Sequence, residues 1–463
     1  MAERIETNGI VSTNGWMSHV RETLSLGIPL IGAQLAQLGI HVTDIFIIGR
    51  LGTVELAAMV LAGQYFFTVF IFGSGFATAV VPMAAHAFAQ GDKVMVRRSV
   101  RMGLWVIVGY AAILSPAIWF AESVLIAAGQ KPEVAALAGH YVNIAGWGMI
   151  PALGFMVLRS FLSAVGRASF ILYVTIIILV LNAICAYALV LGHFGLPALG
   201  MTGAAIVALF VNIVGFLLTI LYIEWRPDLR SYELFVRFWR ADWHMLREVF
   251  VLGLPIGLSI LAEVSLFTVA SLLMGWIGTI ELAAHGIALQ WASVAFMIPL
   301  GLAQAATVRI GVAAGARDRV GMIRAAWVVV AMSAGCAMLG GLLYALIPRE
   351  LASLYLDASK PDSGAVLDYA ASLVVIAGIF QLVDGLQAIG HGLLRGIKDT
   401  TIPLILALIS YWAIGFSLAY ILAFPLGFGG IGVWIGFLAG LAAASVLLLW
   451  RFALLARRAV PEL

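Results

Sequence analysis

Three acidic residues stand inside long apolar stretches of this sequence: Asp44, Glu263 and Asp384. A charged side chain at the centre of a bilayer costs about 3 kcal/mol on insertion scales, so each of these residues needs a specific reason to be there. A carboxyl group in a poorly hydrated cavity can bind a proton near neutral pH. Two carboxylates at one depth can instead enclose a hard cation such as Na⁺. Either reaction would couple the movement of an ion to another process.

Glu263 and Asp384 lie about midway along their apolar stretches, whereas Asp44 lies nearer the end of its stretch. We therefore expect Glu263 and Asp384 to meet at similar depth, as a Na⁺ site or a proton site, with Asp44 as a third coupling residue. The alternative is that the acids pair with cations and only hold helices together. No Lys or Arg lies in the middle of an apolar stretch, which favours the functional interpretation.

The elements that must position these acids are membrane-spanning helices. Apolar residues make up 63% of the 463 residues and charged residues only 11%, far from the composition of a soluble domain. Apolar runs of about 20 residues, the length of a helix that crosses a bilayer, occur at 24–48, 57–82, 102–121, 137–158, 169–191, 202–224, 249–275, 283–311, 325–347, 368–394, 403–424 and 431–455. The sequence therefore predicts an all-α membrane protein with twelve transmembrane helices.

The basic residues predict the orientation of these helices. If the N-terminus is inside, the outer loops hold four of the 26 Lys and Arg residues, and 22 lie inside or at inner helix ends. Cytoplasmic loops carry such an excess, so we expect both termini to be cytoplasmic. The four outer residues are Arg50, Lys131, Arg349 and Lys360.

An internal repeat relates the two halves of the chain. At an offset of 226 positions, paired motifs align without a gap: Arg21-Glu22 with Arg247-Glu248, Pro29 with Pro255, and Gly52-Thr-x-Glu-Leu-Ala-Ala with the same motif from Gly278. Compositional bias does not produce such matches in one register, so the chain contains a duplicated six-helix unit. We expect two lobes, residues 1–224 and 249–463, related by a pseudo-two-fold axis around a central cleft that binds substrate.

Residues 225–248 connect the two lobes. Aromatic and Leu residues recur there at roughly helical spacing with Arg residues between them, which predicts a cytoplasmic interfacial helix on the inner leaflet. The alternative is a solvated linker with scattered aromatic residues. Pro29 and Pro255 each remove a backbone hydrogen bond from a spanning helix; they are either matched hinges or ordinary transmembrane prolines.

Polar residues within the spans are candidates for the substrate cleft. Amide side chains can contact a substrate there, or they can simply form hydrogen bonds between helices. The residues that we assign to the cleft are Gln37, Gln64, Gln290 and Gln387.

Several classes of protein are excluded by what the sequence lacks. It contains no GxxxxGK[ST] phosphate loop, so we expect no nucleotide as a direct energy source. It contains neither H-E-x-x-H nor G-x-S-x-G, which argues against an intramembrane enzyme. The basic residues lie between apolar stretches rather than in one patch, so nucleic acid is not an expected partner.

The residues resemble the multidrug and toxic compound extrusion (MATE) family, in its NorM-like branch. The segments that carry the resemblance are the first-helix run from Pro29 to Asp44, the run Pro255-Ile-Gly-Leu-Ser-Ile-Leu-Ala-Glu263, and Gln381-Leu-Val-Asp384 with Leu-Arg395-Gly-x-Lys-Asp. With the twelve-span plan, the similarity covers nearly the whole chain. One departure is Phe380, where some relatives carry a tyrosine one turn before the aspartate.

The resemblance implies a Na⁺- or H⁺-coupled antiporter that exports chemically varied, often cationic, amphipathic drugs and dyes across the bacterial inner membrane. We expect alternating access between the two lobes, a functional monomer and no cofactor beyond the coupling ion. The resemblance also implies that Asn182 and Thr202 are partners of Asp44 in the N-lobe, and that Glu263 and Asp384 form the cation site of the C-lobe.

Two other classes remain open at this point. A flippase for a lipid-linked saccharide would have the same two-lobe fold, with basic residues in the cleft for a pyrophosphate group. A passive channel or a membrane receptor would need neither the buried acid pair nor duplicated halves.

Overall fold

The computed structural model of this chain describes residues 15–356 and 363–458. Lys360 and both chain ends lie outside the described residues. Within them the fold is entirely helical, and twelve helices are long and apolar enough to cross a membrane, which confirms the predicted class. Their bounds are α1 Trp16–Ile48, α2 Thr53–Ala89, α3 Lys93–Trp119, α5 Pro132–Ala145 continued by α6 Met149–Ala164, α7 Ala168–Leu191, α8 Gly200–Trp225, α10 Trp243–Ile277, α11 Thr279–Gly315, α12 Arg319–Leu346, α14 Ser363–Gly396, α15 Thr401–Leu408 continued by the π-helix η2 Ile409–Phe416 and α16 Ser417–Ala423, and α17 Gly429–Arg458.

Several helices begin well before the apolar run that predicts them. The α3 helix starts at Lys93, with the Asp92 carboxylate accepting a hydrogen bond from the Met95 amide at 2.8 Å. The α12 helix starts in the same way, because the Asp318 carboxylate accepts from the Gly321 amide at 2.8 Å. Such caps satisfy amides that have no partner inside the helix. The two capping aspartates are 226 positions apart, so the repeat extends to how the helices begin.

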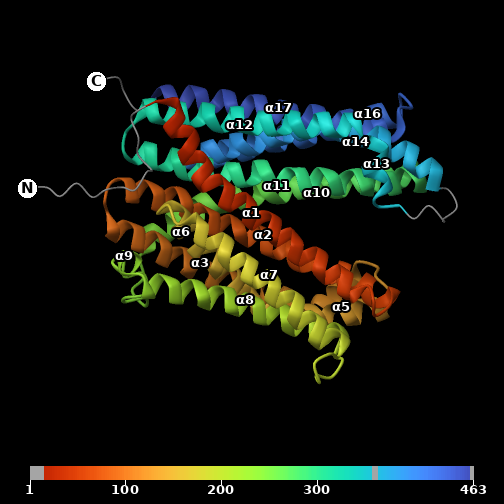
Figure 1. Ribbon diagram of the computed structural model, residues 1–463, viewed down its shortest axis with the longest axis horizontal. Helices are drawn as coiled ribbons and strands as arrows, with labels where there is room; N and C mark the ends of the chain where they lie inside the picture. Colours follow the sequence, from red (N-terminus) through yellow and green to blue (C-terminus); the bar gives the residue numbers. More distant parts are fainter. Residues whose placement is uncertain (1–14, 357–362, 459–463) are drawn as a thin grey trace, which may run out of the picture. The chain divides into compact units, whose positions relative to one another are not determined.

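The chain divides into two compact units. Unit 1 contains the described residues up to Ile31 together with those from Leu258 onward, and unit 2 is Gly32–Gly257. In unit 1, α14 packs against α11, α12 and α17, and in unit 2, α2 packs against α3 and α6 while α7 packs against α8 (Figure 1). Both boundaries fall inside a continuous helix, two residues after Pro29 in α1 and two residues after Pro255 in α10.

The first half of α1 belongs to unit 1, and the first half of α10 belongs to unit 2. Each crosses a neighbouring helix at backbone contact. An added Cβ at Gly75 of α2 would lie 2.5 Å from Gly257 Cα, and one at Gly301 of α11 would lie 2.7 Å from Ile31 N. Small residues permit such close approach of membrane helices. The pairs Gly75/Gly301 and Ile31/Gly257 are each 226 positions apart, so both units use the same crossing.

The two crossings differ in polarity. Arg309 of α11 is buried and donates to Glu22 Oε2 at 2.7 Å and to the His19 carbonyl at 2.6 Å, both on α1. The residues that correspond to Arg309 and His19 at the repeat offset are Met83 and Met245, which are buried in unit 2. Two buried methionines in unit 2 therefore stand where unit 1 has Arg309 and His19, although Glu22 has a glutamate, Glu248, as its counterpart.

The predicted interfacial helix over 225–248 is wrong as a continuous helix. The short helix α9 spans Pro227–Arg230, and the chain then forms turns until α10 begins at Trp243. Glu233 and Arg237 have φ values of 51° and 54°, and a right-handed helix cannot continue through such left-handed residues. Leu229 and Leu234 are buried, so this linker packs into the rest of unit 2, to which it belongs.

The close contacts at Gly75 and Gly301, where two helices cross in each unit, can be tested through the stability of the protein. Gly75→Ala and Gly301→Ala each force a methyl group against backbone, and overpacking of this kind costs about 1–3 kcal/mol. We expect each variant to unfold at a lower temperature in detergent. Gly63→Ala and Gly286→Ala are matched controls on the same two helices, because an added Cβ meets nothing within 4 Å. Equal unfolding midpoints in all four variants would contradict the crossing.

Candidate functional site

Glu263 and Asp384 are brought together in unit 1 by one amide side chain. The Nε2 atom of Gln387 donates to Glu263 Oε1 at 2.9 Å and lies 3.5 Å from Asp384 Oδ1. Glu263 belongs to α10, whereas Asp384 and Gln387 lie one turn apart on α14. The similar depth expected for the two acids is what allows one amide to reach both.

The other end of the same amide is held by a tyrosine. The Tyr411 hydroxyl donates to Gln387 Oε1 at 2.5 Å, and both side chains are fully buried. Tyr411 lies in η2, where the backbone widens to a π-helix for eight residues. Segments of π-helix inside α-helices are frequent at functional sites. With its carbonyl engaged by Tyr411, the Gln387 amide presents its NH₂ group to the carboxylates.

Arg395 corrects one premise of the sequence interpretation. We expected no cation near the acid pair, but the Arg395 guanidinium interacts electrostatically with Glu263 and with Tyr411. Arg395 lies on α14 one residue beyond the predicted apolar run, three helical turns after Asp384. Arg395 lies next to the last residue of α14, which packs against α11, α12 and α17, and its side chain is half-buried.

Two buried hydroxyl groups lie next to residues that neighbour or belong to the acid network. The Ser333 hydroxyl is buried, has no hydrogen-bond partner among the residues that the structure describes, and lies beside Gly385, the residue that follows Asp384. The Ser410 hydroxyl, next to Tyr411 in η2, is also buried and has no partner in the described part of the chain. Hard monovalent and divalent cations prefer such oxygen donors. The donor set therefore fits either a small cation or a shared proton.

Asp44 has its own site in unit 2. The Asn182 amide of α7 donates to Asp44 Oδ1 at 2.7 Å, and Asn182 is 1% exposed. Tyr141 of α5 is buried and interacts electrostatically with Asp44. The Thr202 hydroxyl is instead 3.2 Å from His140 Nε2. Of the two expected partners, the structure brings Asn182 to Asp44 and pairs Thr202 with a histidine.

The four glutamines that we assigned to a cleft fall into two groups. Gln37, Gln64 and Gln290 are exposed on their own units. Gln387 is fully buried within the acid pair, so in this conformation it is part of the acid network and does not line an open surface.

A known family model matches the chain twice, once in each half of the repeat. A family model described as MatE matches residues 29–188 and again residues 255–421, more than half of the chain. The chain belongs to the MatE family. The two matches begin at Pro29 and Pro255, the paired prolines of the repeat. The resemblance to the MATE family is thereby confirmed.

Close relatives within the MatE family cover almost the whole chain. A protein of Rhizobium meliloti (strain 1021) named "Probable multidrug resistance protein NorM" is 62% identical over 96% of this chain and 96% of its own length. A protein of the same name from Agrobacterium fabrum is 60% identical over 99% of both chains. The expectation of a transporter rather than an enzyme agrees with this family and is confirmed.

Solved MATE structures share the fold. A eukaryotic MATE transporter, AtDTX14, superposes with a TM-score of 0.85 at 21% identity, over 96% of this chain and 99% of that chain. An outward-facing multidrug resistance MATE family transporter of the MOP superfamily gives a TM-score of 0.87 at 18% identity, over 98% and 100%. At these identities the likeness concerns the fold alone.

Sequence reasoning missed Tyr411 and Arg395 as members of the site. Tyr411 was one of many aromatic residues in apolar runs, and only its neighbour Ser410 marked that stretch as polar. Arg395 was noticed as part of a family motif but not as a neighbour of Glu263. Its signal was its place on the same helix as Asp384.

The tyrosine provides a test of the amide network. Tyr411→Phe removes the donor to Gln387, a loss of about 1 kcal/mol in stability, and releases the amide from its orientation. Tyr344→Phe is the matched control, because Tyr344 is also buried in unit 1 and donates to the Trp291 carbonyl at 2.8 Å. We expect similar falls in the thermal unfolding midpoint but slower ion-driven transport only in Tyr411→Phe. Equal transport in both variants would argue against a role for the network.

Proposed function

We propose that this protein is a cation-coupled (Na⁺ or H⁺) antiporter that exports multiple, often cationic and amphipathic, drugs and toxic compounds by alternating access. The names of its relatives, which cover almost their full length at 60–62% identity, support drugs as the substrate class. The observation that carries the coupling is the buried pair of Glu263 and Asp384 bridged by Gln387.

The net charge of the cluster around Glu263 and Asp384 supports the binding of one coupling ion in each transport cycle. With Glu263 and Asp384 ionised and Arg395 nearby, the cluster carries a net charge of −1. Binding of one Na⁺ or one proton makes it neutral, and buried charge is far less costly once it is compensated. A cationic drug and the coupling ion can then alternate as counter-ions of the same carboxylates.

The energy of one ion is sufficient for export. A charge that moves through 100 mV releases about 2.3 kcal/mol, so a potential of about 150 mV supplies roughly 3.5 kcal/mol. That corresponds to a concentration ratio of a few hundred. Coupling to a single ion therefore supports a useful drug gradient.

Asp44 is proposed as a second coupling residue, with Asn182 and Tyr141 as its neighbours. Its place in unit 2, away from the acid pair along the chain, makes the two units chemically unequal. Each unit thus contains one ion-responsive group or cluster.

Pro29 and Pro255 are proposed as hinges. The boundary between the compact units lies two residues after each proline, in helices that otherwise run without a break. A residue without an amide hydrogen bond weakens the helix locally. Bending at Pro29 would let the first half of α1 move with unit 1 while the second half moves with unit 2. Bending at Pro255 would let the first half of α10 move with unit 2 while the second half moves with unit 1.

We also propose that the protein lies in the bacterial inner membrane with both termini in the cytoplasm and acts as a monomer. The excess of Lys and Arg residues in the inner loops supports this orientation.

The coupling is tested by ethidium efflux from proteoliposomes with a Na⁺ gradient and a pH gradient imposed separately. We expect Glu263→Gln and Asp384→Asn each to retain folding but to slow gradient-driven efflux at least about tenfold, because each removes a cation-binding oxygen. Efflux driven by Na⁺ alone identifies a metal-ion site, and efflux driven by pH alone identifies proton coupling.

Asp368→Asn is the matched control. Asp368 lies on α14 like Asp384, but it is exposed and pairs with Arg349 at 2.6 Å. Its efflux should equal that of the unmodified protein. Unchanged efflux in Glu263→Gln and Asp384→Asn would refute coupling at this pair. No response of the folded protein to either gradient would favour the flippase.

A further inference from the structure

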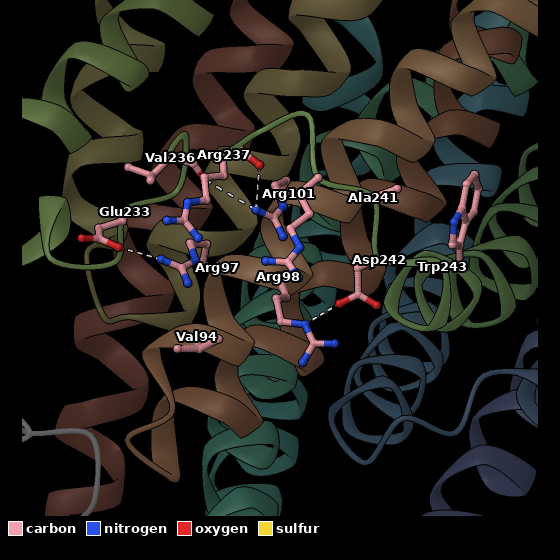
Figure 2. Close-up of a pocket in the computed structure, with 11 residues that line it drawn as sticks. Val94, Arg97, Arg98, Arg101, Glu233, Val236, Arg237, Ala241, Asp242 and Trp243 are labelled. Atoms are coloured by element: carbon pink, nitrogen blue, oxygen red, sulfur yellow. Dashed lines mark hydrogen bonds and ion pairs between the residues drawn. The ribbon is translucent and has the colours of Figure 1, made fainter.

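A basic cavity lies in unit 2 between the first turns of α3 and the linker that precedes α10. It has a volume of about 730 Å³ and is lined by five arginines and two carboxylates, a net charge of +3. Figure 2 shows these side chains around the opening, with Arg97, Arg98 and Arg101 on α3 facing the linker residues. The other two arginines are Arg237 and Arg240.

The carboxylates neutralise only two of the five arginines. Arg97 donates to Glu233 at 2.6 Å, and Arg98 forms an ion pair with Asp242. The hydrogen bond from Arg98 holds the pKa of the Asp242 carboxyl below its usual value. Within the described residues, the side chains of Arg237 and Arg240 form no hydrogen bond or ion pair, although other arginines lie close by.

Arg101 is the residue that most needs an anion. It is 6% exposed, and its Nη1 atom donates only to backbone carbonyls, at 3.0 Å to Arg237 and 3.5 Å to Val236. Within residues 15–356 and 363–458, its Nε atom is buried without a partner, and so is the Nε atom of Arg97. A buried guanidinium that is not paired with an anion is costly. Each of these two arginines therefore has an N–H group without an acceptor among the described residues.

The cavity is not a product of the repeat. At the offset of 226, Arg97 and Arg101 correspond to Ile323 and Trp327 in α12. Both helices begin in the same way, after an aspartate whose side chain caps the first turn. Arg97 and Arg101 are therefore particular to unit 2, whereas Arg98 corresponds to Arg324 of α12.

The position of the cavity selects the kind of anion. It lies at the first residues of α3 and α10, two helices long enough to span a membrane, so it opens near a membrane surface. Trp239 and Trp243 beside it are 78% and 72% exposed, as tryptophans at the boundary between headgroups and hydrocarbon are. Guanidinium groups match phosphate oxygens in pairs.

We propose that this cavity binds the phosphodiester headgroup of an anionic phospholipid, with Arg101 and Arg237 as principal phosphate ligands and Arg240 at the rim. Basic pockets beside membrane helices bind such headgroups. That the lipid belongs to the cytoplasmic leaflet rests on the proposed orientation. The site is separate along the chain from the coupling residues, so lipid binding can be measured without transport.

The test is titration of the delipidated, full-length protein by native mass spectrometry, with dioleoylphosphatidylglycerol, dioleoylphosphatidylcholine and inorganic phosphate as separate probes. We expect phosphatidylglycerol to bind at least about tenfold more tightly than phosphatidylcholine. Arg237→Gln combined with Arg240→Gln should weaken phosphatidylglycerol binding about 10- to 30-fold. Both residues are exposed, so the double variant should fold; its thermal unfolding midpoint verifies this.

Arg226→Gln combined with Arg230→Gln is the matched control. It removes the same charge from the same linker, outside the residues that line the cavity, and should bind phosphatidylglycerol like the unmodified protein. Equal losses in the two double variants, or no loss in either, would overturn the proposal. Inorganic phosphate that binds as tightly as phosphatidylglycerol and displaces it would show a free-anion site and overturn the lipid assignment.

Discussion

The arrangement of unit 1 depends on one requirement: two carboxylates must be held in an apolar helix bundle. The Gln387 amide meets it by donating to Glu263 and lying within reach of Asp384, while Tyr411 engages its carbonyl. An amide that is engaged at both ends is held in one orientation, with its NH₂ group toward the carboxylates. The central position of α14 and the π-helical widening of η2 are what bring these groups from three helices to one point.

The duplicated fold is used unequally. Both units share the crossing near Gly75 and Gly301 and the same capped helix starts. On that common frame, unit 1 has the acid pair and the ionic cluster of Arg309 and Glu22, whereas unit 2 has Asp44 and the basic cavity of α3. Packing constrains backbone positions, and side chains that do not close the packing are free to differ between the halves.

Phe380 lacks the hydroxyl that some relatives have at this position, and another residue supplies a hydroxyl to the acid network. Phe380 packs edge-on against Phe267 and Trp434 in the apolar core of unit 1. The hydroxyl that reaches the acid network comes instead from Tyr411, on a different helix. The departure from the family pattern therefore does not leave the network without a tyrosine.

The sequence alone determined the twelve spans, the repeat and the three acids, because these depend on composition over lengths of about 20 residues and on residues that are costly in a membrane. Tertiary structure decided which polar groups meet. Gln387 reads as one glutamine among several, and Tyr411 as one aromatic residue among many, until helices far apart in the chain pack together. Arg395 and the arginines of α3 lie just outside the apolar runs, and hydropathy does not predict the contacts of residues there. The linker is turned rather than helical because Glu233 and Arg237 adopt left-handed backbone conformations, which side-chain spacing does not reveal.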